Sequence, residues 1–141
     1  MCSNRMANDD QEGGARGRPL SLADRIARWT CGSNRLDTPI RGLSLHRWEA
    51  PTEPESYMLA PSVCLIGQGR KRLFLGDEAY VYDAHRFLIT SVDLPVVTQI
   101  IEASADKPYL GLTMELDLRV IAQLMLSDDR LPGRASNDRL G

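Results

Sequence analysis

The sequence has few of the residues that build metal sites or disulfide frameworks. It contains only two histidines, His46 and His85, and three cysteines, with no H-x-H or C-x-x-C spacing. Structural zinc sites need closely spaced cysteines and histidines, and small disulfide scaffolds need paired cysteines. The composition therefore argues against a zinc ribbon and against a disulfide scaffold. It is typical of a protein of the reducing cytoplasm.

Long apolar runs and an excess of positive charge are also missing. No stretch of about 18 apolar residues is present, and the N-terminal segment lacks the apolar core of a secretory signal. The formal net charge is −2, whereas contact with nucleic-acid phosphates requires a basic surface. These features argue against a membrane span and against nucleic-acid binding by this chain alone. The longest basic run, Arg70-Lys71-Arg72, is interpreted as solvated surface.

The usual sequence signatures of catalysis are missing as well. There is no G-x-S-x-G nucleophile motif, and Gly67-Gln68-Gly69 lacks the G-K-[ST] continuation of a phosphate-binding loop. Cys64 lies in an apolar run, where a cysteine behaves as a small hydrophobic residue. His46 falls on a predicted strand without a second histidine beside it, which is typical of a structural or pocket residue. We therefore expect a binding protein with no catalytic residue, metal or cofactor.

The 141 residues are predicted to form one folded domain with a tail at each end. Residues 1–19 are polar, charged and glycine-rich, so we expect a flexible tail there. Residues 20–126 carry the periodic apolar patterns of a folded unit. Residues 127–141 have the composition of a linker.

Two helices are predicted, one on each side of a β region. The first covers residues 20–30 and begins with a capping box formed by Ser21 and Asp24. Its expected buried face carries Leu22, Ile26 and Trp29. The second begins after Asp117, and its apolar stripe is a candidate dimerisation surface if the β region does not cover it. The residues of this stripe are Val120, Ile121, Leu124 and Met125.

About seven short strands are predicted between the helices, which favours a small antiparallel sandwich or barrel with peripheral helices. Gly76-Asp77 is predicted to form a type II′ hairpin turn, and the proline-rich residues 50–54 are expected to lie outside the sheets. Alternation in residues 109–116 places the leucines and Met114 on one face, toward either the barrel interior or a docked helix. The strands span residues 43–48, 63–66, 71–75, 78–82, 86–91, 96–103 and 109–116.

A ligand-binding wall is predicted from polar and aromatic residues that share strand faces. Tyrosine and tryptophan rings provide flat apolar area together with a polar group, which suits a small polar or aromatic ligand. Which of the two faces points inward is left open by the pattern. The candidate ligand-binding residues are His46, Trp48, Cys64, Glu78, Tyr80 and Tyr82.

Several segments in the same order along the chain resemble the N-terminal domain of AraC-type transcription regulators. Residues 61–71 match the opening P-x-x-x-x-x-x-Q-G-x-K of that domain, and the match extends over roughly residues 20–126. The further matching segments are Leu75-Gly76-Asp77-Glu78, Tyr80-Val81-Tyr82-Asp83, residues 87–95, Glu102-Ala103-Ser104 and Lys107-Pro108-Tyr109-Leu110.

This resemblance implies a cupin-like β-barrel that binds a small effector and takes part in homodimerisation. In full-length relatives a C-terminal region with two helix-turn-helix units binds DNA. This chain reaches Gly141, about where a linker to such a region would lie. We expect either a piece of a longer regulator or a stand-alone sensory domain. Two alternatives are a cupin-type metalloenzyme and a pure dimerisation module with a collapsed interior.

Overall fold

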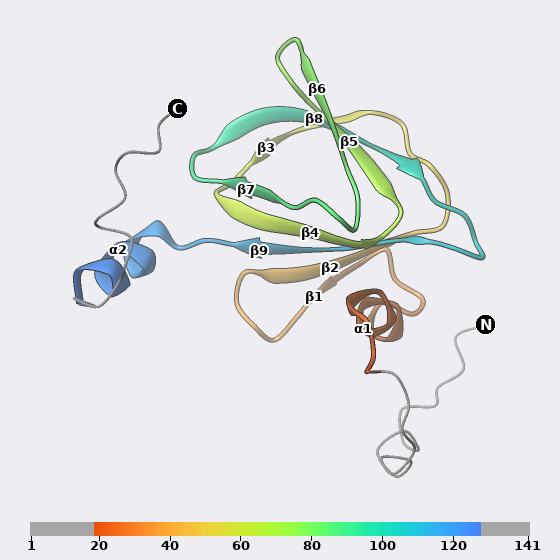
Figure 1. The fold of residues 1–141 in the computed structure, drawn as a ribbon, viewed down its shortest axis with the longest axis horizontal. Helices are drawn as coiled ribbons and strands as arrows, with labels where there is room; N and C mark the ends of the chain where they lie inside the picture. The colour runs from red at the N-terminus through yellow and green to blue at the C-terminus, as the bar shows by residue number, and fades with distance from the viewer. Residues whose placement is uncertain (1–18, 128–141) are drawn as a thin grey trace.

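Short strands with alternating burial are the main regular structure of the computed structural model, which describes residues 19–127 (Figure 1). Nine strands in this range form two antiparallel sheets, ordered β1-β2-β9-β4-β7 and β3-β8-β5-β6, with one helix near each end. The predicted β-sandwich with peripheral helices is confirmed. The elements are α1 (Leu22–Trp29), β1 (Arg35–Asp37), β2 (Leu43–Trp48), β3 (Glu55–Leu59), β4 (Ser62–Gln68), β5 (Arg70–Leu75), β6 (Glu78–Tyr82), β7 (Leu88–Thr90), β8 (Leu94–Glu102), β9 (Tyr109–Glu115) and α2 (Leu118–Ser127).

All seven predicted strands are present, and two further ones were missed. The missed strands are β1, which has only three residues, and β3, an edge strand that directly follows Pro54 and is mostly exposed. Proline before a strand and an exposed edge both weaken the sequence signal. The predicted tails lie outside the described residues, apart from Pro19 and Ser127. No helix within 19–127 combines the length and apolar character that crossing a membrane requires.

The three successive strands between residues 62 and 82 do not all lie in one sheet. β4 belongs to one sheet, whereas β5 and β6 form a hairpin in the other. The chain changes sheets at Gly69, whose φ is +90° and where a Cβ would lie 2.7 Å from the Glu102 carbonyl oxygen. Only glycine fits such a close approach. The hairpin turn itself agrees with the prediction, because Gly76 has φ +59° and no other residue type has positive φ in the described chain.

The main core lies between the two sheets. Both sheets contribute the inward side of their alternating strands, and one part of the interior is filled by aliphatic and tyrosine side chains. The buried residues of this cluster are Leu59, Cys64, Ile66, Leu73, Tyr82, Val96, Ile100 and Tyr109.

A second, smaller cluster joins α1 to the outer face of the first sheet. Ile26, Leu45 and Leu110 are buried together there. The predicted capping box of Ser21 and Asp24 is confirmed, with both of its hydrogen bonds at 3.1 Å. The sequence left open whether the apolar face of β9 points to the barrel interior or to a docked helix. Leu110 faces the docked helix α1.

The predicted buried face of α1 is wrong in two of its three residues. Ile26 is buried, but Leu22 and Trp29 are 37% and 59% exposed. The reason is the close contact of the helix with β4. A Cβ at Gly67 would lie 3.0 Å from the backbone of Ala23, so the helix packs through its small residues. The face with Ala23 and Ile26 is therefore the one that meets the sheet.

The helix α2 lies apart from the sandwich at the far end of β9 (Figure 1). Asp117 caps it as predicted, since its Oδ1 accepts hydrogen bonds from the backbone N–H groups of Arg119 and Val120. Leu124 and Met125 are 61% and 63% exposed. The β region therefore does not cover the apolar stripe of α2.

Candidate functional site

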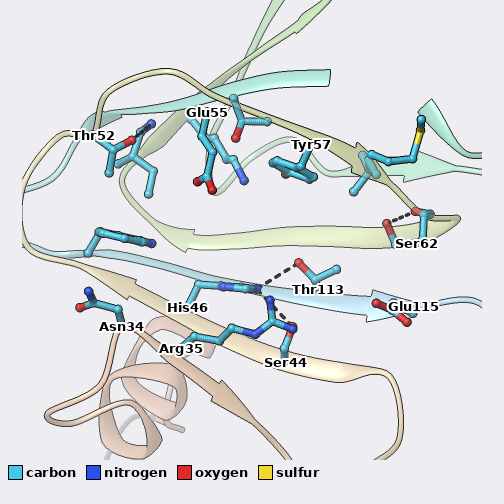
Figure 2. Close-up of a pocket in the computed structure, with 17 residues that line it drawn as sticks. Asn34, Arg35, Ser44, His46, Thr52, Glu55, Tyr57, Ser62, Thr113 and Glu115 are labelled. Carbon is cyan, nitrogen blue, oxygen red and sulfur yellow. Dashed lines mark hydrogen bonds between the residues drawn. The ribbon is translucent and has the colours of Figure 1, made fainter. Parts of the chain in front are cut away.

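A cavity of about 540 Å³ lies between the two sheets, on the side where β2 and β9 face β3, β5 and β8. Figure 2 shows its walls, with His46, Ser44 and Thr113 on one sheet and Glu55 and Tyr57 entering from the other. This volume is within the range of roughly 300–1,000 Å³ that small-molecule sites occupy. The interior is therefore not collapsed in the part of the chain that the structure describes.

His46 is at the centre of a hydroxyl-rich wall. Its Nε2 is within hydrogen-bonding distance of Ser44 Oγ at 3.2 Å and of Thr113 Oγ1 at 3.3 Å. The pKa of His46 is lowered from 6.5 to about 4, mainly by burial and in addition by the nearby charges of Lys71 and Arg35, against a smaller opposing effect of Asp37. The imidazole is therefore neutral at pH 7, and its Nε2 either donates or accepts a hydrogen bond, according to the tautomer.

The hydroxyl network continues from His46 to a buried thiol. Thr113 Oγ1 also contacts Cys64 Sγ at 3.9 Å, and Ser62 Oγ lies 3.7 Å from the same sulfur. Cys64 is a free thiol within the main core.

Four charged side chains line the cavity, and they come from four different strands. Arg35 forms an ion pair with Asp37 at 3.0 Å, and Glu55 and Glu115 are largely exposed. Lys71 enters from β5, and its Nζ lies 6.0 Å from the centre of the Tyr57 ring.

The interpretation of Arg70-Lys71-Arg72 as solvated surface is therefore wrong for its central residue. Arg70 forms an ion pair with Glu102 at 3.1 Å, and Arg72 lies over the ring of Phe74. Lys71 points the other way, because alternation along β5 places it on the same side as the buried Leu73.

The six predicted ligand-binding residues occupy three different places. His46 and Trp48 line the cavity. Cys64 and Tyr82 belong to the main core beside it, where burial raises the pKa of the Tyr82 hydroxyl. Glu78 and Tyr80 do not join this wall, because β6 extends beyond the opposing sheet and leaves both exposed.

The exposed pair on β6 has its own surroundings. Tyr80 donates a hydrogen bond to Glu78, and this bond raises the pKa of the tyrosine hydroxyl. Tyr80 also lines a second, mainly apolar pocket of about 290 Å³ near β7 and β8. The prediction that Glu78 and Tyr80 share a strand face was thus correct, but Tyr80 lines a different pocket from His46.

Sequence reasoning missed Lys71, Tyr57 and Thr113 as cavity residues. Tyr57 belongs to a strand that was not recognised. Thr113 was placed correctly on the polar face of β9, but the apolar face was not assigned to a helix. The amphipathic pattern of α1 could have shown which face of β9 points inward. An amphipathic helix docks on an apolar sheet face, and the opposite face of that sheet then points to the interior.

Within residues 19–127 no three His, Cys, Asp or Glu side chains are grouped so that they could hold a metal ion. Glu49 follows His46 by three residues, but its carboxylate binds the Arg47 side chain at 3.2 Å, and Glu49 does not line the cavity.

Comparison with known proteins gives the family. Residues 39–139 match the family model of the AraC-type transcriptional regulator N-terminus. No curated protein matches the chain. Three solved structures resemble it at low identity, and their TM-scores are too low to support further argument.

The first is a cupin superfamily protein from Desulfitobacterium hafniense, with 17% identity and a TM-score of 0.48, covering 72% of this chain and 94% of that one. The second is Drosophila melanogaster CENP-C bound to CAL1, with 15% identity and a TM-score of 0.39, covering 55% and 64%. The third is a cupin-2 domain containing protein from Shewanella frigidimarina, with 6% identity and a TM-score of 0.38, covering 76% and 90%. Because the family model spans most of its length, the chain belongs to the AraC-type transcriptional regulator N-terminus family.

Proposed function

We propose that this chain is a regulatory domain that binds a small effector in the cavity between its sheets. The observation that supports this proposal is the cavity itself, which has a volume of about 540 Å³ and combines hydroxyl, imidazole, ammonium and aromatic groups on its walls. Family membership supports a role in transcription regulation. DNA contact would then belong to a region outside this chain, in agreement with the net charge of −2.

The domain binds its ligand rather than converting it. No carboxylate among residues 19–127 hydrogen-bonds to His46, whose Nε2 instead faces two hydroxyl groups. An imidazole that acts as a general base usually has a third group that orients it. We therefore expect the effector to be recovered unchanged after incubation with the protein.

Effector binding is expected to change the fluorescence of Trp48, which lines the cavity. The chain has two tryptophans, so Trp29→Phe leaves Trp48 as the single reporter. A library of small acids, amides, sugars and aromatic compounds is first screened by thermal shift, and the stabilising compounds are then titrated against this variant.

A saturable change in Trp48 emission supports the proposal. The Thr113→Val variant keeps the shape of the side chain but removes the cavity hydroxyl. Loss of the emission change in this variant would confirm that the compound binds in the cavity. If no compound in the library stabilises the protein, effector binding in this cavity is refuted.

Dimerisation through α2 is the second part of the proposal. The helix has no contact partner in the described chain that covers Leu124 and Met125. Contiguous exposed apolar faces mark surfaces that interact with other proteins or with membranes. We expect a dimer in sedimentation equilibrium, and we expect the double variant Leu124→Glu/Met125→Glu to raise the dissociation constant at least about tenfold.

The matched control is Gln123→Glu, which adds a charge to the same helix at an exposed polar position. It should leave the dissociation constant within about twofold. A wild-type chain that stays monomeric at all concentrations would exclude dimerisation by this route.

A further inference from the structure

Lys71 has an unusual position for a lysine. It is half-buried on the inward face of β5, in line with Leu73 and Leu75, and its partners across the strands are Tyr82 and Ile100. Tyr82 and Ile100 are both buried in the main core. An apolar residue would be the ordinary occupant of such a position, because a charge inside a sandwich loses hydration.

The ammonium group of Lys71 also lacks a counter-ion among the residues that the structure describes. Within residues 19–127 it takes part in no ion pair or hydrogen bond, and its ammonium group lies over the face of the Tyr57 ring. By contrast, Arg35, Arg47 and Arg70 each form an ion pair with a carboxylate. The carboxylates of Glu55 and Glu115 line the same cavity but do not pair with Lys71.

The surroundings of Lys71 suit an anion next to a flat apolar group. On the opposite wall, the hydroxyls of Ser44 and Thr113 and the imidazole of His46 can donate hydrogen bonds. Trp48 and Tyr57 contribute aromatic rings to the walls of the same cavity. A carboxylate bound near a lysine forms a charge-assisted hydrogen bond, which is stronger than a bond between neutral groups.

We infer that the effector is a small organic anion, and that its carboxylate is held by Lys71 while its flat body lies against Trp48 and Tyr57. This inference rests on the proposed function and gives the chemical class of its ligand. The cations that face the cavity also act on His46, since Lys71 and Arg35 both lower its pKa.

The test uses the full chain and pairs of compounds that differ only in charge. Benzoate, cinnamate and 3-phenylpropionate are each compared with the corresponding primary amide by isothermal titration calorimetry. We expect the carboxylates to bind and the amides to bind at least about tenfold more weakly, since a hydrogen bond to a charged group is stronger than one between neutral groups.

Lys71→Met removes the charge and keeps the length of the side chain, so this variant is expected to fold. It should lose the preference for carboxylates. The matched control is Lys107→Met, because Lys107 is exposed in the turn before β9 and does not line the cavity. The folded state and the orientation of Lys71 are checked without a ligand by NMR titration, in which the pKa of His46 should rise in Lys71→Met.

The outcomes separate this inference from the proposed function. If neutral compounds from the wider library bind at the Trp48 wall and Lys71→Met binds them unchanged, the anion inference fails and effector binding stands. An equal loss of carboxylate affinity in Lys107→Met would also overturn the inference. If neither carboxylates nor any neutral compound bind, both the inference and the proposed function fail.

Discussion

Replacing Ile26 with alanine is expected to lower the free energy of unfolding by about 3 kcal/mol. Ile26 is 1% exposed and packs between Leu45 and Leu110, so the substitution leaves a cavity between α1 and the sheet. The higher helix propensity of alanine offsets only about 0.4 kcal/mol of this loss. Urea unfolding followed by circular dichroism at pH 7 measures the difference.

The control for this substitution lies on the same helix. Leu22 is 37% exposed and does not belong to the cluster around Ile26. Leu22→Ala should change the free energy of unfolding by no more than about 0.5 kcal/mol. Equal effects of the two substitutions would mean that α1 does not dock on the sheet through Ile26. Because the cluster lies outside the cavity, ligand affinity should remain unchanged in both variants.

Acidification from pH 7 to pH 5 is expected to destabilise the fold by about 2 kcal/mol through His46 alone. The pKa of this residue is about 4 in the folded protein and 6.5 in its ordinary state. Between these values the unfolded chain binds a proton that the folded chain does not bind, so stability falls as the pH decreases. The full interval between the two pKa values corresponds to roughly 3 kcal/mol.

His46→Gln isolates this contribution, because glutamine cannot be protonated in this range but can still hydrogen-bond to Ser44 and Thr113. The pH dependence of unfolding between pH 7 and pH 5 should be weaker in the variant by the stated amount. His85 is exposed in a turn, and His85→Gln is the matched control. The same slope in wild type and His46→Gln would contradict the burial of a neutral imidazole.

The fold was largely predictable because its strands follow local rules. Alternation in β2 correctly separated His46 and Trp48 from Leu45, and glycine at Gly76 specified the hairpin turn. What the sequence could not show is how the strands pair. The division of β4 and β5 between two sheets depends on contacts distant in sequence, so the inner wall could not be assembled from local patterns.

Lys71 illustrates the limit of local patterns at the site. A triplet of basic residues resembles a hydrated edge, because composition alone does not distinguish the two faces of a strand. The face is determined by the pairing of β5 with β8 and β6, which places Lys71 between Ile100 and Tyr82. Tyr80 is the opposite case. Its strand face was predicted correctly, but the sequence did not show how far the β6 hairpin extends beyond the opposing sheet.

The strand that forms the floor of the cavity leads almost directly into the exposed helix. Thr113 and Glu115 line the cavity, and α2 begins at Leu118. Leu116 donates a backbone hydrogen bond to the Pro61 carbonyl at 2.8 Å, and Asp117 caps the helix, so both connecting residues are tied down. We therefore expect a displacement of β9 by an occupant to change the orientation of α2, because only two residues, both hydrogen-bonded, separate the strand from the helix.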